Sequence, residues 1–226
     1  MTDPANDLIL LQHGDSFFPS GAVSFSWGLE TLVEDGRVHS ADSVSEFLVN
    51  QIHYRWATSD RAALAAAHGA GADLEAVITI DLQVEAQILA HELRDGSRRT
   101  GRALLSVHDK LGTPLAQAFH DRVRAGDTPG HVAVAQGLVW RGVGLTLGQA
   151  ELLSAHTYSI GVLGAAVRLG IIGHVDAQRI LLITRETLVG MLRETAPPVS
   201  EMSTFTPATE IAAMRHETAE IRLFAN

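Results

Sequence analysis

Apolar residues recur at three- and four-residue steps along most of this chain of 226 residues. That spacing places them on one face of an α-helix. The clearest run is Val44, Phe47, Leu48, Ile52 and Trp56. Because a helix with one apolar face buries it against other elements, the pattern predicts an all-α fold, a single multi-helix bundle domain. We place the helical body at residues 1–195 and a linker with a C-terminal tail at residues 196–226.

Local signals predict where several helices begin. Ser43 and Glu46 have the spacing of a capping box at the start of the run through Trp56. Thr146 and Gln149 have the same spacing ahead of a later apolar run. Thr113-Pro114 predicts another start, because proline is tolerated in the first position of a helix.

Two segments need a choice between structures. Residues 78–85 alternate apolar and polar side chains, which is the period of a strand. Residues 74–93 also fit one helix, and the longer pattern favours the helix. A later helix is expected to end before Pro197-Pro198, since proline does not fit a helix interior. The proline-rich stretch 195–207 is typical of an extended linker.

The composition excludes several classes of protein. The net charge is −9, so attraction to nucleic acid or to an anionic membrane is not expected. The absence of cysteine rules out disulfides, iron–sulfur clusters and thiol catalysis. Lys110 is the one lysine and follows no glycine-rich loop, so the chain is not a P-loop NTPase. There is no run of about 18 apolar residues and no basic secretory signal, and we expect a cytoplasmic protein.

Residues that could carry catalysis do not form a convincing set. The chain has 11 histidines, but no two stand at H-x-H, H-x3-H or H-E-x-x-H spacing. Residues 24–28 resemble a nucleophile elbow, but they lack its first glycine and a preceding strand. We therefore expect no metal site and no catalytic residue. An alternative hypothesis is a helical metal-dependent hydrolase that uses His91, Glu92 and other scattered histidines.

The C-terminus is unusual because it is apolar. Chain ends are normally frayed and polar, whereas Ile221, Leu223 and Phe224 stand here beside Arg215 and Arg222. Such a tail either folds back on its own domain or docks on a partner. The residues by themselves leave both interpretations open.

Both ends of the chain resemble one protein family. Residues 18–30 read FPSGAVSFSWGLE and resemble the LP-x-GG-[F/Y]-S-x-S-x-G-L-E signature of UreF-type urease accessory proteins. Residues 211–224 read IAAMRHETAEIRLF and resemble the RHE…RLF terminus of that family. Between them, ELR at 92–94 and AVRLG at 166–170 resemble two further family segments. The matches stand in family order and span nearly the whole chain.

The resemblance implies a non-enzymatic, dimer-forming protein. Such proteins bridge the accessory protein UreD (UreH) and the GTPase UreG, and they assist GTP-dependent delivery of nickel to apo-urease. GTP would then be bound by UreG, nickel would be at most transient on this chain, and no cofactor would be held stably. No nucleic-acid or membrane partner is implied. A third hypothesis is a generic helical adaptor, which would bind neither UreD nor UreG.

The resemblance also implies roles for residues. The tail residues expected to dock on UreD are Arg215, His216, Glu217, Arg222, Leu223 and Phe224. The signature loop and helix contain Pro19, Gly21, Ser24, Ser26, Gly28 and Glu30. Candidates for contacts with a second copy or with UreG are Glu92, Arg94, Arg168, Gly173 and Gln178. The chain departs from the family pattern at Ala22, where a second glycine is usual, and at His174, where glutamine is common.

Overall fold

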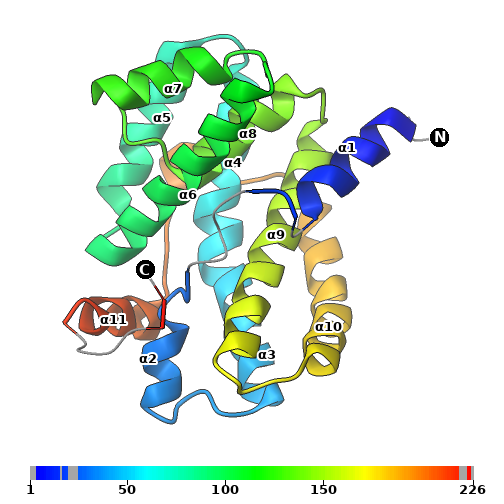
Figure 1. Cartoon of the computed structure of the whole chain (residues 1–226), viewed down its shortest axis with the longest axis vertical. Helices are drawn as coiled ribbons and strands as arrows, with labels where there is room; N and C mark the ends of the chain where they lie inside the picture. The colour runs from blue at the N-terminus through cyan, green and yellow to red at the C-terminus, as the bar shows by residue number, and fades with distance from the viewer. Residues whose placement is uncertain (1–3, 16, 20–24, 219–222, 225–226) are drawn as a thin grey trace.

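The computed structural model describes residues 4–15, 17–19, 25–218 and 223–224. These residues form helices and no strand, which confirms the all-α prediction (Figure 1). The elements are α1 (Pro4–Gly14), α2 (Leu29–Glu34), α3 (Ala41–Gln51), the π-helix η2 (Ile52–Asp60), α4 (Arg61–Ala70), α5 (Leu74–Gln87), α6 (His91–Lys110), α7 (Ala116–Ala125), α8 (Val132–Gly142), α9 (Leu147–Arg168), α10 (His174–Leu192), the 3₁₀ turn η3 (Val199–Glu201) and α11 (Pro207–His216). Within the described ranges, no helix has both the length and the apolar character that crossing a membrane requires.

Helices α4, α6, α8 and α9 form the centre of the molecule. α8 packs against α4 and α6, and α9 packs against α4, α8 and α10 (Figure 1). Two glycines let backbones approach closely. A Cβ on Gly137 would overlap the carbonyl oxygen of Leu64, and one on Gly101 would overlap that of Gly130. These contacts fix α8 between α4 and α6 and give the surrounding segments a rigid support.

One capping box is confirmed and the other is wrong. Thr146 begins α9, and its hydroxyl and the side chain of Gln149 make the reciprocal bonds. The box at α3 uses Ser40, whose extended backbone (φ −147°) lets its hydroxyl accept from the amide of Ser43. Ser43 is therefore the third helical residue, and Glu46 lies beyond the first turn.

Two further boundaries differ from the sequence prediction. α7 begins at Ala116 and not at Thr113-Pro114, because Leu115 adopts a left-handed conformation (φ 66°). The Thr113 hydroxyl instead lies 2.8 Å from Nδ1 of the His108 ring. The choice of helix over strand is confirmed for residues 74–87, but the prediction of one helix through residue 93 is wrong, because α5 ends at Gln87 and α6 begins at His91. Ile88 and Ala90 between them are extended and buried.

The predicted linker follows the surface of the π-helix η2. The amides of Ser203 and Phe205 donate to the carbonyl oxygens of Thr58 and Tyr54, at 3.2 and 2.8 Å. The Thr58 hydroxyl donates in return to the carbonyl of Ser203 at 2.6 Å. The linker is therefore hydrogen-bonded to the body along its course, and α11 comes to rest beside α2 and α6 (Figure 1).

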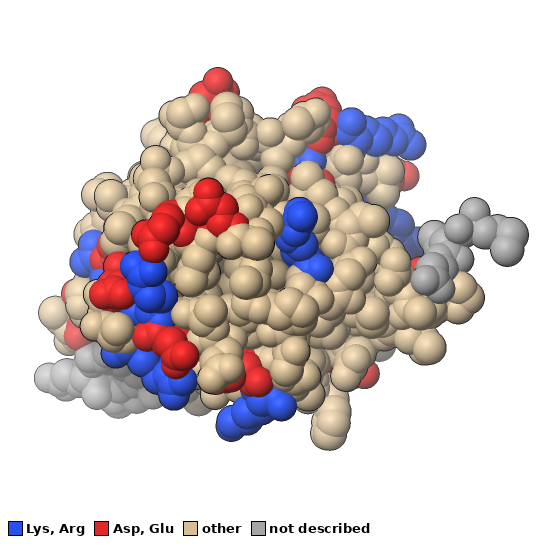
Figure 2. Space-filling view, turned by 90° about the horizontal axis from the view of Figure 1, so that it is seen from above, with Lys and Arg blue, Asp and Glu red and all other residues tan. Residues whose placement is uncertain are grey.

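Charged side chains of both signs lie next to one another on the face seen from above (Figure 2). Ion pairs of this kind join Arg122 to Glu75 at 2.7 Å and to Asp127 at 2.5 Å. Both pairs raise the pKa of Arg122. The face in Figure 2 therefore carries mixed charge and no broad patch of one sign.

Candidate functional site

Helix α11 is seated on the turn that leads into α2. Gly28 has a positive φ of 75°, and a Cβ there would lie 2.8 Å from the carbonyl oxygen of Thr209. Only glycine combines that conformation with that approach. The side-chain amide of Gln51 donates to the Thr209 hydroxyl at 2.7 Å and fixes the helix from the other side. The turn at Gly28, in the described end of the N-terminal signature, therefore supports α11.

His216, at the end of α11, lies between two buried carboxylates. Its Nε2 is 2.9 Å from Glu30 and its Nδ1 is 2.7 Å from Glu92. All three side chains are almost completely buried. An ionised carboxylate only accepts hydrogen bonds, so with both glutamates ionised each ring nitrogen donates and the ring is an imidazolium. Removing one partner of a buried ion pair typically costs about 3–5 kcal/mol.

The carboxylates of Glu30 and Glu217 also bind backbone groups. The Glu30 carboxylate accepts from the amides of Leu223 at 2.6 Å and Phe224 at 3.2 Å. Glu217 accepts from the amide of Glu92 at 3.2 Å, in the first turn of α6. Helix α6 has no cap from its own preceding residue, so Glu217 satisfies one of its open donors and places a negative charge at its positive end. The tail is thus connected to both α2 and α6.

Phe224 also packs on the body. We call the contacts of the described residues within 216–224 with α2, α6 and Arg168 the tail junction. Its ring is buried, and the Arg168 guanidinium lies 4.7 Å from the ring centroid in a cation–π contact. Partial burial lowers the pKa of Arg168, which remains charged. Arg215 makes a bidentate pair with Asp35 at 2.6 and 3.0 Å on the surface. That pair holds the pKa of Asp35 below its usual value and raises that of Arg215.

Other tail residues remain open to solvent. Ile211 is 58%, Met214 44% and Leu223 63% exposed. We call these three side chains the tail surface. The described part of the tail therefore packs on its own body through His216 and Phe224, and it also presents apolar side chains outward. Arg222 lies outside the described residues.

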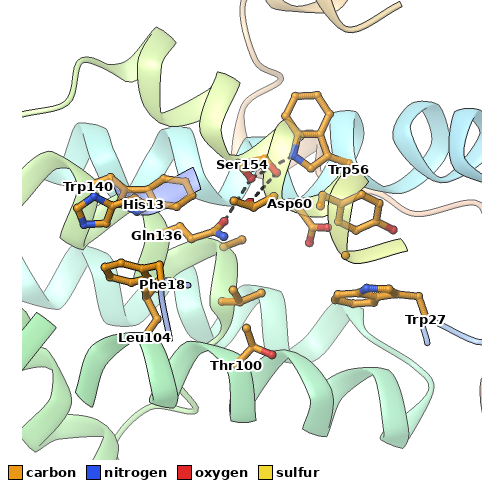
Figure 3. A pocket seen from close by; sticks show the side chains of 15 residues that line it. His13, Phe18, Trp27, Trp56, Asp60, Thr100, Leu104, Gln136, Trp140 and Ser154 are labelled. Carbon is orange, nitrogen blue, oxygen red and sulfur yellow. Dashed lines mark hydrogen bonds between the residues drawn. The ribbon is translucent and has the colours of Figure 1, made fainter. Parts of the chain in front are cut away.

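A cavity lies deeper in the body, where α1 and residue 18 meet α6, α8 and α9 (Figure 3). Its volume is about 60 Å³, and Trp56 and Asp60 reach it from the π-helix. π-Helical turns often occur at functional sites. Burial raises the pKa of Asp60, and Arg55 at 3.7 Å lowers it by less. Burial also raises the pKa of Tyr158 and lowers that of His13.

Ser97, His131 and Glu85 have the appearance of a catalytic triad. Ser97 Oγ lies 3.0 Å from Nδ1 of His131, whose Nε2 lies 2.8 Å from Glu85. Ser97 is buried, and its hydroxyl also accepts from the amide of Val132 at 3.4 Å. Burial is the main cause of the lowered pKa of His131. The group therefore holds the start of α8 in place and does not present a nucleophile.

In the part of the chain that the structure describes, His216 contacts Glu30 and Glu92, but the three do not form a metal-binding set. No three His, Asp or Glu side chains gather there in a metal-binding arrangement. The exposed ring of His91 faces Asp95 at 3.4 Å.

Comparison with a family model and comparison with individual known proteins give the same family. The family model named UreF matches residues 38–183. A urease accessory protein UreF from Trichodesmium erythraeum is 33% identical over 100% of this chain and 99% of its own length. Urease accessory protein UreF 1 of Brucella melitensis is 33% identical over 97% of this chain and 92% of its own length. The UreF of Yersinia pseudotuberculosis is 31% identical over 98% and 99%.

The chain belongs to the UreF family of urease accessory proteins. It is therefore an accessory factor by family. The sequence predicted this membership from the two terminal motifs. The structure adds that the described parts of those motifs meet, since Glu30 from the first binds His216 and Phe224 from the second.

The remaining signature residues of this UreF protein have different surroundings. Ser26 is buried, and its carbonyl accepts from the amide of Leu29 at 2.9 Å. Pro19 is exposed. Gly21 and Ser24 lie outside the described residues. The described residues 25–30 of the signature are therefore buried, and Gly28 and Glu30 among them contact the tail.

The residues predicted to contact a second copy or UreG do not form one site. Glu92 and Arg168 belong to the tail junction. Arg94 binds the carbonyl of Ile88 at 3.1 Å, Gly173 starts α10, and Gln178 is exposed on α10. The internal cavity had no signal in the sequence, because its lining comes from residues between 13 and 161.

Proposed function

We propose that this chain is a urease maturation scaffold with no catalytic role of its own. It bridges UreD (UreH) and the GTPase UreG while nickel is delivered to apo-urease in a GTP-dependent step. UreG binds the GTP, and nickel is cargo. This maturation of urease takes place in the cytoplasm. Family membership over the whole length of the chain supports the maturation role.

The observation that carries the docking proposal is the tail surface. Exposed apolar side chains on a segment whose backbone is fixed by buried contacts support an interaction site there. The backbone N–H of Leu223 donates a hydrogen bond to the Glu30 carboxylate and so holds Leu223 in place, while its side chain is exposed. UreD is the partner proposed for this surface.

Single-residue changes test the docking proposal more sharply than truncation. Removing residues after 207 would also remove His216 and Phe224 from the core. We would compare Ile211→Asp and Leu223→Asp with Leu111→Asp, an exposed leucine 60% accessible at the end of α6. Both tail variants should lose co-purification with UreD and fail to restore urease activity and nickel content in a host lacking its own UreF. Leu111→Asp should behave like the wild type, and UreD capture by both tail variants would refute the docking proposal.

We also propose that the chain forms a homodimer through α10. Val175, Leu182 and Val189 are exposed at seven-residue steps along that helix, which is the spacing of a helix-pairing seam. Leu182→Asp should convert a dimer into a monomer by light scattering. An unchanged mass would exclude this face of α10 as the dimer contact.

A further inference from the structure

The internal cavity contains polar groups that nothing in the described structure satisfies. Thr100 Oγ1, Trp140 Nε1 and His13 Nε2 are buried without a hydrogen-bond partner, and all three residues line it. Asp60 also lines it, and Arg55 Nε lies 3.7 Å from its carboxylate, beyond hydrogen-bonding distance. Figure 3 shows Asp60 on one side of the cavity and His13 with Trp140 on the other. Buried polar groups in native proteins are hydrogen-bonded, so this space has an occupant.

Charge decides what kind of occupant fits. Asp60 is the one acidic residue among the described residues of the lining, and Arg55 beside it already balances its charge. A cation would leave a net positive charge in a buried space, and an anion would face the Asp60 carboxylate. An apolar guest would leave the polar groups unsatisfied. A small neutral molecule that both donates and accepts hydrogen bonds remains.

The unsatisfied groups of the cavity need an occupant that both donates and accepts hydrogen bonds. Nδ1 of His13 lies 2.8 Å from the carbonyl of Ile9, which only accepts, so Nδ1 carries the proton and Nε2 is an acceptor. Trp140 Nε1 is a donor, and the Thr100 hydroxyl is either. A volume of about 60 Å³ accommodates roughly four water molecules. A second space of about 10 Å³ on the other side of Asp60, beside Arg55 and Glu210, is the size of about one.

We propose that the cavity binds a cluster of ordered water molecules that fastens the N-terminal segment to the helical body. His13 and Phe18 close the cavity from that segment, while the opposite walls belong to α6, α8, α9 and the π-helix. His13 is buried, but the apolar side chains of Leu8 and Leu11 on the same helix are exposed. Helix α1 packs mainly against α9. The waters thus replace direct contacts that α1 does not make.

Two glycines of α9 provide a matched test. Gly161 lines the cavity and Gly164 does not, and a Cβ on either meets no atom within 4 Å. Gly161→Leu should fill the cavity, remove most of the long-lived internal waters counted by deuteron relaxation dispersion, and speed amide exchange in α1 at least tenfold. Gly164→Leu should leave both readouts as in the wild type.

Thr100→Val is a second variant that removes one partner without filling the space. It should lose one long-lived water and keep the rest. The proposal is overturned if the wild type holds no long-lived water, if the two leucine variants give equal counts, or if native mass spectrometry finds another small molecule retained in the purified protein.

Discussion

The buried imidazolium of His216 makes a quantitative prediction. His216→Gln removes the cation that lies 2.9 Å from Glu30 and 2.7 Å from Glu92. Both carboxylates then stay buried without the charge of that ring, so unfolding should become easier by about 3–5 kcal/mol. For a chain of this size, each kcal/mol lowers the melting temperature by about 2–4 °C. The expected shift is therefore about 10 °C.

The assay is urea and thermal unfolding followed by circular dichroism, with a double-mutant cycle. Glu92→Gln in the His216→Gln background removes one of the two carboxylate charges that faced the ring, so the double variant should be more stable than His216→Gln alone. Arg215→Gln is the matched control on the same helix, because the Arg215–Asp35 pair is on the surface. It should leave the midpoint unchanged.

A loss smaller than about 1 kcal/mol for His216→Gln would contradict the imidazolium assignment, since a buried ion pair would cost more. So would additive effects of the two substitutions, because residues in one charged network are expected to couple. A direct check is nuclear magnetic resonance of the ring, where both N–H groups should be protected from exchange.

Three other predictions concern stability. Gly28→Ala should cost about 1–3 kcal/mol in urea unfolding, since it combines a positive φ with an overlap on Thr209; Gly36→Ala, also at positive φ but in open space, should cost less. Gly164→Ala should raise stability by about 1 kcal/mol, because the helix interior favours alanine and its Cβ meets nothing within 4 Å. Burial lowers the pKa of His108 to about 4 from 6.5, so the unfolded chain takes up the proton first. Stability should fall by up to about 3 kcal/mol as pH drops from 6.5 to 4, and a His108→Gln variant whose pH profile is equally steep would refute this.

The sequence predicted those parts of the fold that rest on local signals. Thr146 and Gln149 form their box within a single turn, so four residues contain the information. The break at Ile88–Ala90 has a different origin. Both residues are apolar and fit the helical pattern, but the body buries them in an extended conformation. Tertiary packing overrides local preference there.

In the tail junction, too, the sequence indicated the residues but not their long-range contacts. The terminal motifs indicated which residues belong together in the family, but not that Glu30 and Glu92 would share one histidine. Those contacts span 186 and 124 residues, and spacing along a chain contains no information about such a pair. The role of Asp60 is harder to predict from the sequence. Nothing in its neighbours along the sequence distinguishes it, and its position in the cavity follows from the π-helical turn that ends there.

The meeting of Glu30 with residues 216–224 has a consequence for biosynthesis. Proteins are made from the N-terminus, and their domains begin to fold in that order. Glu30 is synthesised 186 residues before His216, and Glu92 is synthesised 124 residues before it. Until His216 and Glu217 have been added, the two carboxylates lack the histidine ring and α6 lacks the cap that Glu217 supplies. A chain that stops short of residue 216 therefore cannot form these contacts.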